Sequence, residues 1–210
     1  MYDLLVDVMS VLLFISIFLL ICGIGTWGFK AFRHQMYCGL GYFLILLLFE
    51  IVSYLLSGNN LFMLSISSFV NFAFLTYFYC AYFFKKSIKK IIPIILIGTI
   101  PMIISLILGY SFQNFQSYDR ALYSFAIMLL SLYYFYWILN ENEKASRESI
   151  ILNSFVLLFF SIDTFLAVGT NYLINENLML VAWFWFFRAI FLQLYYGSLI
   201  YYSWQIGKTQ

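Results

Sequence analysis

Seven long apolar stretches, separated by short polar segments, run through this chain of 210 residues. They cover residues of about 4–29, 37–57, 61–84, 91–110, 119–139, 149–173 and 178–204. Each holds close to the roughly 20 residues that an α-helix needs to cross a bilayer. We therefore predict an all-α fold: one domain over residues 1–210, with seven transmembrane helices in contact with the lipid bilayer. A water-soluble domain is excluded, because 64% of the residues are hydrophobic and 10% are charged, whereas soluble domains carry about 25% charged residues.

The basic residues alternate between the two sides of the predicted membrane. Nine of the 11 Lys and Arg residues follow the first, third, fifth and seventh stretches. On the opposite side only Arg120 is basic, and Asp119 is next to it. Because positively charged loops stay in the cytoplasm, we predict an external N-terminus and a cytoplasmic C-terminus, in a bacterial inner membrane. The acidic first residues lack the lysines of a signal peptide, so the first stretch is expected to be a retained span.

An arginine, Arg188, lies in the middle of the last apolar stretch. An arginine in hydrocarbon costs about 3 kcal/mol on insertion scales, so it needs a partner. The candidates are Glu50, Asp163 and Asn71, each in its own stretch. Counted from the predicted outer helix ends at about 1.5 Å per residue, all four lie roughly 10–15 Å deep. We predict that they face one another, and that Arg188 pairs with Asp163, with Glu50 or with both.

These polar residues predict a site inside the membrane. Tyr195 follows Arg188 by seven residues, which places it on the same helix face. Arg188, Asp163, Glu50, Asn71 and Tyr195 are therefore expected to line a pocket that opens outward and takes a ligand or a proton. Two acids and one arginine leave one carboxyl without a cation, and such a carboxyl is either protonated or paired with a ligand or ion. The alternative is a salt-bridge network that only fixes helix packing.

The residues that catalyse reactions in membranes are scarce in this chain. His34 is the one histidine and lies in a predicted cytoplasmic loop, so a zinc protease would lack ligands and a serine hydrolase would lack its base. The surroundings of Asp163 lack the Gly-x-Gly-Asp pattern of a diaspartyl protease. The three cysteines form no Cys-x-x-Cys pair,. We expect no enzyme, no cofactor and no metal, and the net charge of +2 is too small to indicate nucleic acid as a partner.

Glycine and proline predict two packing features. The segments Gly23-Ile24-Gly25 and Gly39-Leu40-Gly41 lie in apolar stretches, where small residues let helices approach closely. Gly98 and Pro101 are expected to kink the fourth stretch in its middle.

The overall plan resembles the small seven-helix membrane proteins of bacteria that act as sensory input units for histidine kinases. The resemblance rests on the seven-span plan and on the segments Asn175-Glu176-Asn177-Leu178 and Trp183-x-Trp185-x-x-Arg188. It implies a receptor or sensor for a small-molecule ligand. Its signal would pass to a separate cytoplasmic protein such as a histidine kinase, because this chain carries no kinase domain. That partner is expected to bind at residues 85–90 and 140–149.

A second resemblance is architectural. Stretches one to three and five to seven share an orientation, with the fourth as a linker, which is similar to the 3+1+3 plan of facilitators with parallel repeats. It implies a small-solute or proton-coupled transporter in which Glu50 corresponds to Asp163, and Asn71 to Arg188. Such a transporter needs an inward path past Tyr195 and Tyr202. The Pro-Gln pair of many such transporters is missing, and the sensor and transporter hypotheses both stay open.

Overall fold

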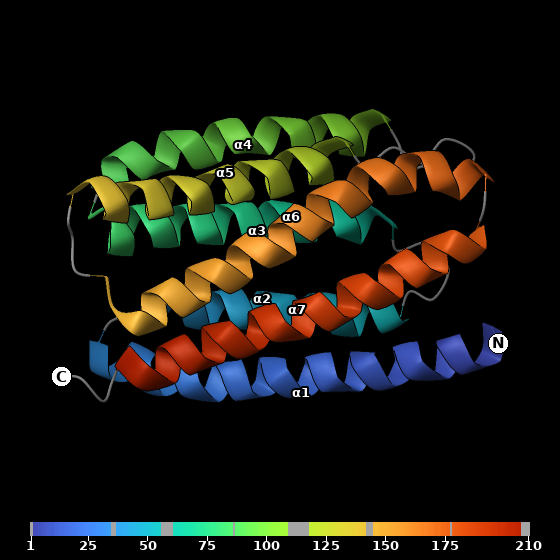
Figure 1. Cartoon of the computed structure of the whole chain (residues 1–210), viewed down its shortest axis with the longest axis horizontal. Helices are drawn as coiled ribbons and strands as arrows, with labels where there is room; N and C mark the ends of the chain where they lie inside the picture. Colours follow the sequence, from blue (N-terminus) through green and yellow to red (C-terminus); the bar gives the residue numbers. More distant parts are fainter. Residues whose placement is uncertain are drawn as a thin grey trace.

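The part of the chain that the structure describes forms seven long α-helices that run alternately in opposite directions (Figure 1). This computed structural model describes residues 2–34, 37–55, 61–85, 87–108, 118–141, 145–176 and 178–206. The helices are α1 (Tyr2–His34), α2 (Tyr37–Leu55), α3 (Leu61–Phe78), α4 (Ile88–Leu108), α5 (Tyr118–Glu141), α6 (Arg147–Glu176) and α7 (Leu178–Ile206). A π-helical turn, η1 (Tyr79–Phe83), follows α3. All seven helices are long and apolar enough to cross a membrane, so the all-α prediction with seven spans is confirmed. The orientation of the termini stays a prediction.

Six helices follow one another around the bundle in the order α1, α2, α3, α5, α6 and α7, and α7 closes against α1. The remaining helix, α4, lies at the edge of the bundle and packs against α3 and α5 (Figure 1). Most of its apolar side chains are exposed, including Ile97 and Ile107. A helix with this surface suits contact with lipid, where exposed apolar side chains meet a solvent as apolar as themselves.

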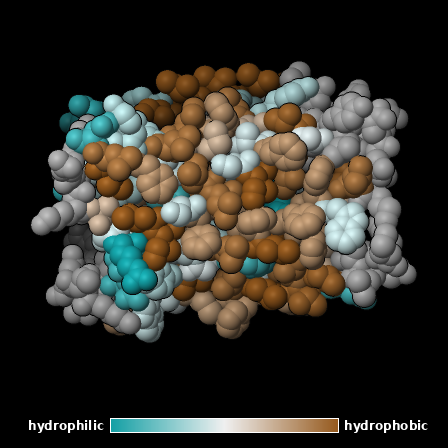
Figure 2. Space-filling view, viewed as in Figure 1, coloured by the Kyte–Doolittle hydropathy of each residue, from teal (hydrophilic) through white to brown (hydrophobic). Residues whose placement is uncertain are grey.

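The surface of the bundle is predominantly apolar. Figure 2 shows apolar side chains over most of the visible face, with the larger hydrophilic groups toward the end where α5 stops and α6 begins. On α1, the side chains of Phe14 and Phe18 are about two-thirds exposed, at 67% and 65%. Large apolar side chains exposed in such number indicate a membrane or protein interface. With seven helices of membrane-spanning length, this is the surface of an integral membrane protein.

Two glycines bring α1 and α2 together. A Cβ on Gly39 would lie 1.9 Å from Cε3 of Trp27, and one on Gly23 would lie 2.3 Å from Cδ1 of Phe43. Both rings are almost wholly buried, so neither has room to move aside. The predicted role in close packing is confirmed for Gly23 and Gly39, and it is wrong for Gly25 and Gly41, where an added Cβ would meet open space.

The helix α4 continues through Pro93 and Pro101. Near Pro101 the hydroxyl of Tyr123 in α5 enters the backbone ladder: Met102 N–H donates to Tyr123 Oη at 3.0 Å, and Tyr123 Oη donates to the Gly98 carbonyl at 2.6 Å. In a regular helix that N–H would donate to that carbonyl directly. An inserted side chain is a recognised cause of helix distortion. The hydroxyl enters the ladder at Gly98 and Met102, and the kink predicted from Gly98 and Pro101 stays a prediction.

Candidate functional site

Asp163, near the middle of α6, binds two arginines from two other helices. Its Oδ1 accepts hydrogen bonds from Arg120 Nη2 at 2.5 Å and from Arg188 Nε at 2.6 Å. Its Oδ2 accepts one from the hydroxyl of Ser124 at 2.5 Å. Asp163 is 3% exposed, and a carboxylate this deeply buried needs such partners. The predicted pair of Arg188 and Asp163 is confirmed, and it ties α6 to α7 as Arg120 ties α6 to α5.

The structure adds the direction of the Arg120 side chain to the sequence prediction, which assigned this residue to the outer side with Asp119. Arg120 is the third residue of α5, yet its side chain turns into the bundle and is 1% exposed. Asp119 is also buried and accepts a hydrogen bond from Ser65 of α3. An arginine in the first turn of a helix has a side chain long enough to reach inward, and the hydropathy of the sequence does not show this direction. Both arginines outside the predicted cytoplasmic segments thus converge on Asp163.

The charge count of the site changes accordingly. Asp163 has two cationic partners, so it is not the carboxyl left without a cation. Asp163 makes both ion pairs found within the described residues, and Glu50 and Asp119 take part in neither. Glu50 lies within electrostatic reach of Arg188. With Asp119 and Arg120 included, three carboxyl groups stand against two arginines, so one carboxyl is still in excess, and it is that of Glu50 or Asp119.

The two arginines share an aromatic neighbour. Cζ of Arg120 lies 5.2 Å from the ring centroid of Trp185, and Cζ of Arg188 lies 5.4 Å from it. At these distances the face of a tryptophan attracts a cation. Two buried polar atoms here have no hydrogen-bond partner, Nη1 of Arg120 and Oδ1 of Asp119. Such an atom costs about 1–3 kcal/mol when it stays unpaired, and in native proteins it often marks a place for water or a ligand.

A second group of polar side chains joins α2, α3 and α7. The hydroxyl of Tyr42 donates to Asn71 Oδ1 at 2.5 Å and lies 2.9 Å from the hydroxyl of Tyr195. The ring of Phe159 stacks on that of Tyr195, with centroids 5.3 Å apart, and its centroid lies 5.7 Å from Cζ of Arg188. Asn71 and Tyr195 therefore meet through Tyr42, and Phe159 connects them to the ion pairs. Sequence reasoning missed Tyr42, which is one of 18 tyrosines and has no distinguishing spacing.

A third group of polar side chains lies nearer the start of α6. Asn153 is fully buried and accepts hydrogen bonds from the hydroxyl of Tyr79 in η1 and, at 2.7 Å, from that of Ser131 in α5. Its Nδ2 donates to the Ser131 carbonyl at 3.2 Å. Asn153 precedes Asp163 by ten residues, so α6 carries both groups. Sequence reasoning also missed this group.

A further polar contact fastens α1, the first helix, to α7. Gln193 Nε2 donates to the Leu12 carbonyl at 3.0 Å and to the hydroxyl of Ser16 at 2.7 Å. Such bonds hold membrane helices together where the hydrophobic effect does not distinguish helix from lipid.

The predicted outward-opening pocket involves parts of the chain outside the described residues. Asp163 and Arg120 are closed off, and the side chain of Arg188 is 16% exposed. The structure does not describe residues 56–60 and 109–117 or the side chains of residues 170–179, so this prediction lies partly outside the described residues.

Comparison with known proteins finds no relative for this chain: no family model, curated protein or solved structure matches it. The candidate site is therefore interpreted from its own residues.

Proposed function

We propose that this protein is a membrane receptor or sensor unit that detects a small ligand beside Asp163 and signals to a cytoplasmic protein. The observation that carries this proposal is the sequence of polar and aromatic contacts along one helix. α6 contributes Asp163 to the ion pairs, Phe159 to the stack on Tyr195, and Asn153 to the group at η1. Because packed helices move as rigid bodies, a shift of α6 at one group is transmitted to the others.

Two unpaired atoms on neighbouring residues of α5 indicate the chemistry of the proposed ligand. Arg120 Nη1 offers a hydrogen-bond donor, and Asp119 Oδ1 on the adjacent residue offers an acceptor. A small polar molecule with both an acceptor and a donor would satisfy the two atoms together. Arg120 also binds Asp163 of α6, so a ligand bound to Arg120 would favour one arrangement of α5 and α6 and would shift the population of conformers.

The opposite end of the bundle provides the proposed output. Tyr79, bonded to Asn153, begins the π-helical turn η1, and π turns in helices occur often at functional sites. Lys85 follows η1 with a positive φ of 51°, and Lys85 and Lys89 are exposed. In the predicted orientation this end faces the cytoplasm. A separate protein such as a histidine kinase would bind there and at the start of α6.

One observation favours the alternative, a small-solute or proton-coupled transporter with a 3+1+3 plan. The helices α1, α2 and α3 form the first half of the ring, and α5, α6 and α7 form the second. The contacts α1–α2, α2–α3 and α3–α5 of the first half are repeated in the second half as α5–α6, α6–α7 and α7–α1, while α4 lies outside the ring. In the first half Tyr42 and Asn71 join the second and third helices, as Asp163 and Arg188 do in the second half. Two halves with the same helix order are typical of transporters with parallel repeats.

Access from the cytoplasmic side separates the two functions. Ser198 of α7 is 5% exposed and lies one turn from Tyr195, on the path that a transporter must open inward. We would introduce Ser198→Cys or Ser87→Cys into protein whose three native cysteines are alanine, and add an impermeant thiol reagent to the cytoplasmic face of membrane vesicles. A sensor keeps Ser198→Cys unlabelled while Ser87→Cys, at the exposed end, reacts. Labelling of Ser198→Cys supports the transporter, and an unreactive Ser87→Cys contradicts the orientation.

The partner is tested by direct binding. If a histidine kinase without membrane spans is encoded beside this protein, the purified kinase should bind the protein in nanodiscs. The double variant Lys85→Gln, Lys89→Gln should weaken that binding. A kinase that binds the variant and the native chain equally well does not use this surface, and a kinase that binds neither refutes the proposed partner.

A further inference from the structure

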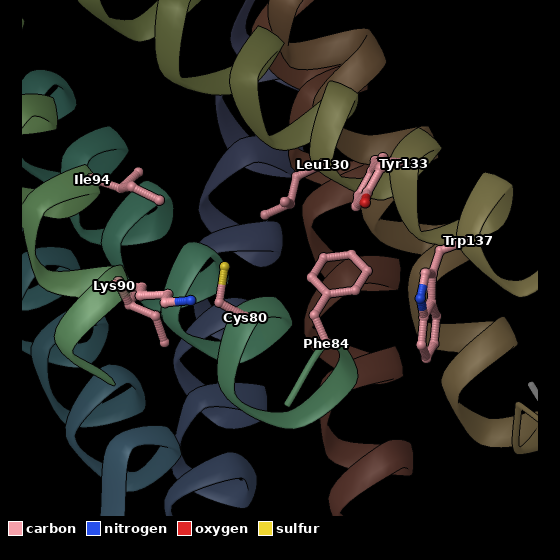
Figure 3. A pocket seen from close by; sticks show the side chains of 8 residues that line it. Cys80, Phe84, Lys90, Ile94, Leu130, Tyr133 and Trp137 are labelled. Carbon is pink, nitrogen blue, oxygen red and sulfur yellow. The ribbon is translucent and has the colours of Figure 1, made fainter. Parts of the chain in front are cut away.

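A cavity of about 350 Å³ lies between η1, α4 and α5, at the end of the bundle away from the ion pairs. Its lining includes Cys80, Phe84, Lys90, Leu130, Tyr133 and Trp137. Figure 3 shows these side chains around a common space, with the ammonium group of Lys90 directed into it and Trp137 on the far side. The cavity shares none of these residues with the candidate site, so its occupant is a separate question.

The cavity lies at the level where the helices leave the membrane. The apolar part of α3 and η1 ends at Phe83, that of α4 begins at Lys89, and that of α5 ends at Asn140. Lys90 and Trp137 are within three residues of two of these ends, and Trp and Lys are typical of the membrane interface. Leu130 is seven residues deeper along α5 than Trp137, or about 10 Å. The cavity therefore extends from the headgroup level into the hydrocarbon.

The chemistry of the lining changes with depth. At the interface it offers the Lys90 ammonium, and Lys89 beside it is also exposed. Deeper, it offers the apolar side chains of Ile94 and Leu130, whereas the ring of Phe84 packs against Tyr133 and Trp137 nearer the interface. Ile94 is 47% exposed, so the cavity opens sideways, toward lipid. An occupant that matches both parts has an anionic head and a long apolar tail.

We propose that this cavity binds an anionic phospholipid, with its phosphate at Lys90 and an acyl chain along Ile94 and Leu130. Basic pockets between transmembrane helices on the cytoplasmic side take the headgroups of anionic lipids, and this end is cytoplasmic in the predicted orientation. A free anion would leave the apolar part of the cavity empty. A zwitterionic lipid would fill that part but would bring no net charge to Lys90. The proposal is independent of the sensor and transporter hypotheses.

The test measures lipid binding to the delipidated full-length protein by native mass spectrometry. The probes are dioleoyl phosphatidylglycerol and dioleoyl phosphatidylcholine, which differ in headgroup and share acyl chains. Lys90→Gln should weaken phosphatidylglycerol binding about fivefold, the effect of one basic residue near an anionic surface. Lys89→Gln removes the same charge from the adjacent residue and should change the binding much less. Phosphatidylcholine should bind more weakly than phosphatidylglycerol and should not respond to Lys90→Gln.

A second pair of variants tests the acyl-chain part. Ile94→Trp adds bulk at the cavity and should weaken both lipids, whereas Ile97→Trp adds the same bulk one turn away on the exposed face of α4 and should weaken neither. Equal effects of Lys89→Gln and Lys90→Gln, or of the two tryptophan variants, would overturn the proposal. It would also fail if phosphatidylcholine bound as tightly as phosphatidylglycerol, or if an equal concentration of glycerol phosphate displaced the bound lipid.

Discussion

Replacing Asp163 by asparagine should destabilise the protein more than removing either of the arginines that it binds. Asp163→Asn leaves Arg120 and Arg188 without their shared counter-charge in a site where Arg120 is 1% exposed. Stranding a buried charge costs about 3–5 kcal/mol. In Arg188→Met the carboxylate keeps Arg120 and Ser124, so the loss is one charge-assisted hydrogen bond, about 1.5–3 kcal/mol. Arg120→Met should fall between these variants, because Arg120 is the more deeply buried arginine.

The assay is unfolding by sodium dodecyl sulfate in mixed micelles, followed by far-ultraviolet circular dichroism. Glu50→Gln is the matched control, since it makes the same change from acid to amide at a residue outside both ion pairs, and it should cost less than about 1 kcal/mol. Adding Arg188→Met to Asp163→Asn should recover part of the loss, with a coupling of about 1–3 kcal/mol. The reasoning is refuted if Asp163→Asn costs no more than Arg188→Met, or if Glu50→Gln is equally harmful.

Three further variants test separate contacts. Tyr42→Phe removes the hydroxyl that hydrogen-bonds to Asn71 of α3 and Tyr195 of α7. It should lower the free energy of unfolding in the same assay by about 1–2 kcal/mol, and an unchanged unfolding midpoint would contradict these hydrogen bonds. Gly39→Ala places a Cβ inside the buried ring of Trp27, whereas Gly41→Ala meets open space. Gly39→Ala should therefore clearly lower the midpoint of thermal unfolding, and Gly41→Ala should not. Equal midpoints would show that the close approach of α1 and α2 is absent. Tyr123→Phe removes the hydroxyl from the α4 ladder, and amide exchange at Met102 should become faster; unchanged exchange would argue that the N–H has another acceptor.

The helices could be predicted because the bilayer leaves few choices. A chain in hydrocarbon must satisfy its backbone groups internally, so seven apolar stretches of sufficient length become seven helices, and their observed ends lie within a few residues of the predicted ones. The partner of Arg188 could be predicted for a similar reason, because a charge in the membrane needs a counter-charge. Both predictions follow from the free-energy cost of unpaired backbone groups and unpaired charges in hydrocarbon, which applies to any fold of this chain.

The remainder of the site depends on helix rotation and tilt, which spacing does not determine. α6 crosses the bundle obliquely in Figure 1, so counting 1.5 Å per residue along the membrane normal misjudges depth on that helix. Glu50 was placed level with Asp163 by this count and forms no ion pair with Arg188. The inward turn of Arg120 and the hydrogen bonds of Tyr42 and Asn153 depend on the same rotations.

The measurement that most directly tests the central claim, that both arginines share Asp163, is a nitrogen–carbon dipolar coupling in solid-state NMR of the protein in lipid bilayers. The guanidinium nitrogens would carry ¹⁵N and the aspartate carboxyls ¹³C, with the Asp163 signal identified by its loss in Asp163→Asn. The coupling to Asp163 should persist in Arg188→Met, because Arg120 remains, and also in Arg120→Met, because Arg188 remains. It should vanish when both arginines are replaced. Loss of the coupling in either single variant would contradict the shared site.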